Sequence, residues 1–138
     1  MKYIIQRQLS VAIENQPGKL AELSLALATH GINIKDLSVV DNVEQGVIRL
    51  VPSDAAMCKS LLVQEGFYVV EADVLIVILP DTPGQLARFC QALAKAQINI
   101  DYAYGSEDRP EQSIRLVMKV SNLKKRSEER RVGKECRL

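Results

Sequence analysis

The chain has 138 residues, of which 47% are hydrophobic and 25% are charged, and its formal net charge is +1. These values are typical of a soluble globular protein and suit either one ordinary domain or two small ones. No apolar run approaches the roughly 20 residues that a membrane-spanning helix needs. Residues 1–7 do not resemble a secretory signal, so we expect a cytoplasmic protein with no membrane partner.

Hydrophobic periodicity predicts a regular order of elements in the first half of the chain. Apolar residues alternate in three segments, as in half-buried strands, and recur at helical spacing in two others. Pro17 is expected at the first position of the first helix, which Gly31 ends, and Ser53 or Asp54 is expected to cap the second helix. The expected order is strand, helix, strand, strand, helix, over residues 4–13, 20–30, 33–41, 46–51 and 54–65.

The second half continues with segments of the same kinds. Residues 67–79 form one long extended stretch, which we interpret as the last strand of one unit running directly into the first strand of the next. Thr82 and Gln85 fit a capping box, in which Thr82 caps the following helix. That helix and two further strands are expected over residues 86–93, 98–104 and 113–120.

The two halves are copies of one another, offset by 66 residues without a gap. Each copy carries a proline-glycine turn after its first strand, then a helix, then an isoleucine-asparagine-isoleucine run at its next strand. Self-similarity at a fixed period indicates a repeated structural unit. The matched pairs include Pro17 and Pro83, Gly18 and Gly84, Leu20 and Leu86, Asn33 and Asn99, Ile34 and Ile100, and Arg49 and Arg115.

This order predicts an α+β fold built of two ferredoxin-like βαββαβ units, each an antiparallel sheet with its helices on one face. We expect the first unit over residues 1–72 and the second over residues 73–123. The second unit lacks a recognisable closing helix and strand. We therefore expect one edge of its sheet to be exposed, which would lower its stability or solubility.

Residues 124–138 differ in composition from the rest of the chain. They hold seven Lys or Arg and three Glu, a net charge of +4, whereas residues 1–123 carry −3. The segment lacks the apolar face that a closing helix needs, and it resembles a foreign fusion scar or a disordered tail. A basic arm for nucleic acid is the alternative, but interspersed glutamates dilute its charge, so we expect no nucleic-acid partner.

The two repeated turns resemble those of ACT domains. The resemblance is carried by residues 15–20 with 31–34, and by residues 81–86 with 98–100. The tandem pair is similar to free-standing double ACT proteins, which implies a non-catalytic, homodimeric regulator that binds an amino acid where two units meet. By the family's pattern the ligand-binding residues are Asn15, Pro17, Gly18, Lys19, Leu20, Asn33, Ile34, Asp81, Gly84, Gln85, Leu86, Asn99 and Ile100.

The chemistry of the turn agrees with a ligand that carries a carboxylate. A helix N-terminus offers unpaired N–H groups and the positive end of a dipole, and a glycine lets a ligand approach the backbone closely. Asn15 is matched by Asp81, whose charge favours an ammonium group, so we expect the first turn to receive a carboxylate better. The alternative is that the turns and the asparagines have purely structural roles.

Two other functions stay open. One is a regulatory subunit of an amino-acid biosynthetic enzyme, such as acetolactate synthase. The other is an enzyme on a ferredoxin-like scaffold, which needs a nucleophile–base pair or a metal cluster. The chain has one His, and Cys58, Cys90 and Cys136 are dispersed. We therefore expect no catalytic residue, no metal site and no cofactor.

Overall fold

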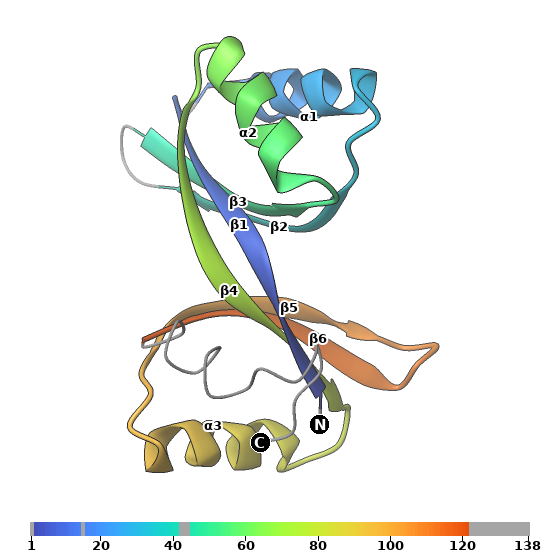
Figure 1. Ribbon diagram of the computed structural model, residues 1–138. Helices are drawn as coiled ribbons and strands as arrows, with labels where there is room; N and C mark the ends of the chain where they lie inside the picture. Colours follow the sequence, from blue (N-terminus) through green and yellow to red (C-terminus); the bar gives the residue numbers. More distant parts are fainter. Residues whose placement is uncertain (1, 15, 42–44, 122–138) are drawn as a thin grey trace. The chain divides into compact units, whose positions relative to one another are not determined.

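The computed structural model describes residues 2–14, 16–41 and 45–121 (Figure 1). Strands and helices alternate in the predicted order. Within the described residues, no helix is both long and apolar enough to cross a membrane. The elements are β1 (Lys2–Glu14), α1 (Lys19–Thr29), β2 (Ile34–Asp41), β3 (Gln45–Pro52), α2 (Ala55–Gln64), β4 (Tyr68–Pro80), α3 (Gln85–Lys95), β5 (Ile100–Asp108) and β6 (Ser113–Val120).

The chain forms two compact units, and both long strands contribute to each of them. We call Arg7–Ala72 the first unit, and Met1–Gln6 together with Asp73–Leu138 the second unit. The start of β1 therefore lies in the second unit and its remainder in the first. β4 is divided in the opposite sense, since it begins in the first unit and ends in the second.

In the first unit the strands follow the order β2-β3-β1-β4. β3 pairs antiparallel with both β1 and β2. α1 and α2 cover one face of this sheet (Figure 1). Their buried leucines meet the apolar residues of that face, as the alternation of strand residues predicts. The resulting core comprises Leu9, Val11, Leu23, Leu27, Ile32, Ile48, Leu50, Cys58 and Leu62.

In the second unit the order is β1-β4-β6-β5, and β6 pairs antiparallel with β4 and β5. α3 lies on one face of this sheet (Figure 1). Phe89 and Leu93 are its buried residues. The core comprises Tyr3, Leu75, Val77, Leu79, Phe89, Leu93, Ile98, Met118 and Val120. The α+β class and the tandem ferredoxin-like units are therefore confirmed.

The start of β1 corrects two expectations about the second unit. Residues 1–6 were expected to belong to the first unit, and the edge of the second sheet beside β4 was expected to be exposed. Instead β1 neighbours β4 in the sheet, and Tyr3 lies in the second core with only 2% of its surface exposed. Ile5 also packs against that core. The chain's own first strand thus occupies the place of the expected closing strand. Residues 122–138, where a closing helix and the predicted tail fall, lie outside the described part.

The starts of α1 and α3 differ from the predicted caps. Each helix follows a left-handed glycine, Gly18 with φ 89° and Gly84 with φ 91°, and neither has a side-chain cap hydrogen bond. Pro17 is therefore in the turn before the helix rather than at its first position, and Thr82 is not the cap of α3. The prediction for α2 is confirmed, since Asp54 accepts a hydrogen bond from the Met57 N–H at 3.0 Å.

Candidate functional site

The candidate site begins at two matching corners, which join β1 to α1 and β4 to α3. At the first, the Lys19 N–H reaches the Gln16 carbonyl only at 3.4 Å, and at the second the Gln85 N–H reaches the Thr82 carbonyl at 3.3 Å. Both bonds are longer than the usual range for N–H···O contacts. Because no side chain caps either helix, the N–H groups of the first turn face outward with weak or no internal partners.

Both corner glycines leave space for a ligand. A Cβ placed on Gly18 or on Gly84 meets no heavy atom within 4 Å. Their positive φ angles belong to a backbone conformation that other residues adopt only with strain. The glycines are therefore needed for the turn itself, and the lack of a side chain also opens the backbone to solvent.

Exposure divides the predicted site residues into two groups. Asn15 lies outside the described residues. Those that are exposed are Pro17, Gly18, Asn33, Asp81, Gly84, Leu86 and Asn99, and those that are half-buried are Lys19, Leu20, Ile34, Gln85 and Ile100. Three of the half-buried residues have a structural role, since Leu20 and Ile34 pack against the first core and Ile100 packs against the second.

The two asparagines are held by serines that the sequence analysis did not identify. The Asn33 N–H donates to the Ser53 hydroxyl at 3.0 Å, and the Ser53 N–H donates to the Asn33 carbonyl at 2.8 Å. Asn99 and Ser121 repeat both bonds, at 2.8 and 2.9 Å. These paired bonds fix the start of β2 against the end of β3, and the start of β5 against the end of β6. The backbone of each asparagine is therefore structural.

The side chains of the two asparagines differ. The Asn99 amide donates to the Asp101 carboxylate at 3.0 Å, and the Lys119 ammonium lies 3.6 Å from the other oxygen of that carboxylate. The counterpart of Asp101 in the first unit is Lys35, which offers no such acceptor. Within the described residues the Asn33 amide has no hydrogen-bond partner. Asn33 is thus the more available of the two for a ligand.

The corner and the asparagine of one unit lie at opposite ends of the same helix. α1 has 11 residues, which span about 16 Å at 1.5 Å per residue. Gly18 precedes this helix and Asn33 follows it, and α3 separates Gly84 from Asn99 in the same way. One small ligand therefore cannot touch both groups of a single unit.

One cavity of the second unit includes residues of the second corner. It has a volume of about 300 Å³ and is lined by Asp81 and Thr82 together with Glu107, Arg109 and Gln112. The Asp81 N–H donates to the Gln112 carbonyl at 2.9 Å, which ties the corner to the connection between β5 and β6. The sequence analysis named Asp81 alone among these residues. Its partners come from a polar turn without a recognisable motif.

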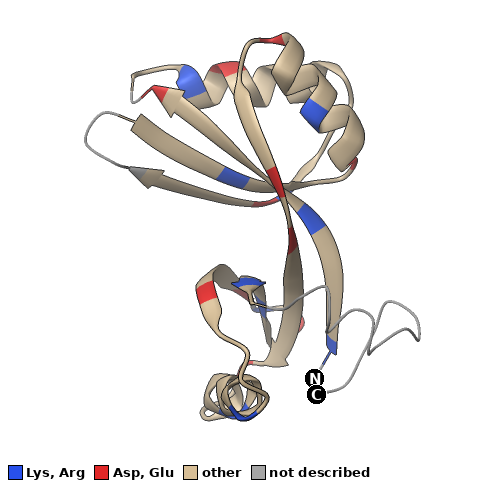
Figure 2. Ribbon diagram, turned by 60° about the vertical axis from the view of Figure 1, so that its left-hand side comes forward, with Lys and Arg blue, Asp and Glu red and all other residues tan. Residues whose placement is uncertain are grey.

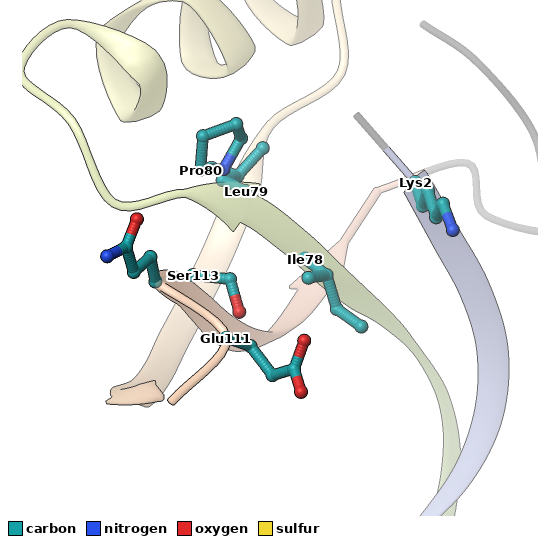
Figure 3. A pocket seen from close by; sticks show the side chains of 7 residues that line it. Lys2, Ile78, Leu79, Pro80, Glu111 and Ser113 are labelled. Carbon is teal, nitrogen blue, oxygen red and sulfur yellow. The ribbon is translucent and has the colours of Figure 1, made fainter. Parts of the chain in front are cut away.

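A second, open cavity of about 450 Å³ lies nearby on the same unit and contains none of the predicted site residues. Lys2 of β1, residues 78–80 of β4 and residues 111–113 line it. Figure 3 shows Ile78 and Glu111 directed to the same side of β4. Its lining combines one aliphatic side chain with separate charged groups, so it has no arrangement specific to one chemistry.

The other chemistry-bearing residues have structural surroundings. Burial, and then the charge of Asp54, raise the pKa of the Cys58 thiol to about 11, which makes it a poor nucleophile near neutral pH. His30 Nδ1 lies 3.1 Å from the Ala26 carbonyl, the cap contact that its position predicts. Among the described residues there is no cluster of three metal-ligating side chains. Basic and acidic positions are interspersed along the described strands and helices (Figure 2).

Comparison with known proteins identifies the family. The family model described as an ACT domain pair matches residues 4–131. Protein BT0572 of Bacteroides thetaiotaomicron has 28% sequence identity and a TM-score of 0.84, over 97% of this chain and 93% of that one. The ligand-free regulatory subunit of aspartate kinase from Thermus thermophilus has 20% identity and a TM-score of 0.64, over 83% of each chain. The corresponding subunit from Thermus flavus has 23% identity and a TM-score of 0.60, over 86% of each chain. No curated protein matches the chain. The match over nearly the whole length shows that this chain belongs to the ACT domain pair family.

Proposed function

We propose that the protein is a non-catalytic regulator that binds a small amino acid at its strand-to-helix corners. The observation that carries this proposal is the shared geometry of Gly18 and Gly84. Both begin a helix in the left-handed conformation, without a side-chain cap and with open space where a side chain would be. Membership of the ACT domain pair family supports a regulatory role, because ACT domains are regulatory modules.

The proposed ligand contact at a corner is a carboxylate. Outward-facing N–H groups at a helix N-terminus donate to an anion, and the helix dipole adds an effective charge of about +0.5 there. Charge-assisted bonds of this kind contribute roughly 1.5–3 kcal/mol each. A free amino acid carries such a carboxylate together with an ammonium group and fits within the size of one corner.

The second half of each proposed site comes from another unit or another copy of the chain. Gly18 and Asn33 stand at opposite ends of α1, so an asparagine that contacts the ligand at one corner must belong to a different unit. This is the arrangement in which a ligand links units. It supports a homodimer as part of the proposal, in which the ligand favours one assembly over another.

Thermal shift against the common amino acids tests the proposal. A ligand that binds only the folded protein stabilises it by about 2.7 kcal/mol at a concentration of 100 times its Kd. We expect one or a few amino acids to raise the melting temperature, and their effect to be lost in Gly18→Ala, whose Cβ occupies the approach to the backbone.

Gly66→Ala is the matched control for this experiment. Gly66 has φ 91°, lies in the same unit and also has open space at its Cβ position, so its substitution costs comparable strain. We expect Gly66→Ala to lower the melting temperature of the free protein as Gly18→Ala does, but to retain the ligand-dependent rise. If no amino acid stabilises the wild-type chain, the proposed function is wrong.

A second candidate is a regulatory subunit that acts on a separate biosynthetic enzyme. The observation in its favour is that two solved structures with this fold are regulatory subunits of aspartate kinase, matched over 83% and 86% of this chain. At these identities the likeness is one of fold. Affinity purification of the tagged full chain from its host tests this candidate. Stoichiometric recovery of one large catalytic chain would favour it, and recovery of the tagged chain alone would exclude it under those conditions.

A further inference from the structure

The second corner differs from the first in the sign of its charge. The cavity beside it is walled by two carboxylates and one guanidinium, from Asp81, Glu107 and Arg109. Arg109 Nε donates to Glu107 Oε1 at 2.8 Å, so these two charges neutralise each other. In the described part of the chain the Asp81 carboxylate has neither a hydrogen-bond partner nor an ion pair. The wall thus retains one uncompensated negative charge.

This charge outweighs the dipole of the helix that follows. The N-terminus of α3 contributes an effective charge of about +0.5, whereas an ionised carboxylate contributes −1. The sum at the second corner is therefore about −0.5. The counterpart of Asp81 in the first copy is Asn15, which is neutral, so there the same dipole acts alone and the sum is about +0.5.

Neutral polar groups complete the cavity. The Thr82 hydroxyl and the Gln112 amide each supply an oxygen that accepts a hydrogen bond, and both residues line the same space as Asp81. An ammonium group donates three hydrogen bonds and needs three acceptors. Asp81, Thr82 and Gln112 together offer that number, whereas a carboxylate in the same cavity would meet the charge of Asp81.

We propose that the cavity at the second corner receives a primary ammonium group, while the first corner receives a carboxylate. This inference rests on the proposed function, since it names the chemical group taken by each of the proposed sites. The two ends of one amino acid zwitterion would then bind at corners of opposite charge. A ligand with an amine and no carboxylate would bind at the second corner alone.

Butylamine and butyrate test the inference, because they share an alkyl chain and differ in the charged group. Each is titrated into the ¹⁵N-labelled full chain, and amide chemical shifts report the two corners separately. We expect butylamine to shift the amides of Gly84 and Gln85, and butyrate to shift those of Gly18 and Lys19. Equal shifts of Gly84 by both compounds would overturn the inference.

Two variants identify the responsible charge. Asp81→Asn gives the second corner the side chain that the first one has, and we expect it to weaken butylamine binding about fivefold, the factor of an exposed ion pair. Glu111→Gln is the matched control, since Glu111 removes the same charge from a neighbouring turn but lines the other cavity. Its butylamine affinity should change less than twofold. Equal weakening in both variants would overturn the assignment to Asp81.

The same titrations separate this inference from the proposed function. If amino acids stabilise the chain but butylamine leaves Gly84 and Gln85 unshifted, the ammonium site is wrong and the proposed function stands. If no amino acid stabilises the chain but butylamine binds in an Asp81-dependent way, the proposed function is wrong and the ammonium site stands.

Discussion

Tyr3→Ala should destabilise the half of the sequence that is farthest from it. Tyr3 is the third residue of the chain, yet it is 98% buried in a core whose other members lie between Leu75 and Val120. Replacing a buried aromatic residue by alanine costs about 3–5 kcal/mol. We take about 3 kcal/mol, because neighbours at a chain start relax more easily than those at the centre of a core.

Hydrogen exchange measures this effect one unit at a time. At 1.4 kcal/mol per factor of ten, a loss of about 3 kcal/mol speeds exchange through unfolding of the second unit about a hundredfold. We expect this increase for the amides of β6 and a smaller one for those of β3, which belongs to the first unit. Tyr68→Ala is the matched control, since Tyr68 is 72% exposed and should change stability by less than about 0.5 kcal/mol. An unchanged rate in β6 together with faster exchange in β3 would refute the assignment of the first strand to the second core.

Three further predictions concern single positions. Gly105→Ala should destabilise the second unit by about 3 kcal/mol in chemical denaturation, because its Cβ would collide with the Arg115 carbonyl oxygen. Gln97→Gly should stabilise that unit by about 1 kcal/mol, since Gln97 has φ 58°, a conformation that costs other residues energy and glycine little. The unfolding free energy should fall as pH rises from 9 to 11. Burial raises the pKa of Cys58 from 9.0 to about 11, so the unfolded state loses the thiol proton first.

Each of these predictions has a built-in comparison. Gly46→Ala tests the first, because its Cβ would meet neighbours at 3.5 Å or more and it should be tolerated. Equal destabilisation by both alanines would mean that Gly105 is not sterically required. For Gln97, lower stability of the glycine variant would contradict the strain argument. For Cys58, the loss of stability between pH 9 and 11 should be smaller in Cys58→Ala, and an unchanged loss would assign it to other groups.

The repeat and the fold class could be predicted from the sequence because both depend on local patterns. Alternation marks each strand and helical spacing marks each helix, and these signals need no knowledge of distant residues. The offset of 66 residues aligned the two corners correctly, and Gly18 and Gly84 have φ angles within 2° of one another. The corner is therefore encoded within a few neighbouring residues.

The destination of the first strand could not be predicted in this way. Residues 2–6 read as part of a strand whichever sheet they join, and only packing against Phe89 and Met118 assigns them to the second unit. The serine partners of the asparagines were missed for a related reason. Ser53 and Ser121 are 68 residues apart rather than 66, so the repeat aligns Ser53 with Lys119 instead. Spatial equivalence survives such an insertion, whereas a fixed sequence offset does not.

The two copies also separate the residues that the fold requires from those that are free to select a ligand. Gly31 and Gln97 differ in sequence, yet both have positive φ at the end of a helix and their N–H groups bond in the same pattern. The backbone there is conserved between the copies even at a cost in strain. Asn15 and Asp81 differ in charge, and the following glycine corners keep one geometry in both copies. Because the fold tolerates either side chain before the corner, that position is free to set which charged group each corner receives.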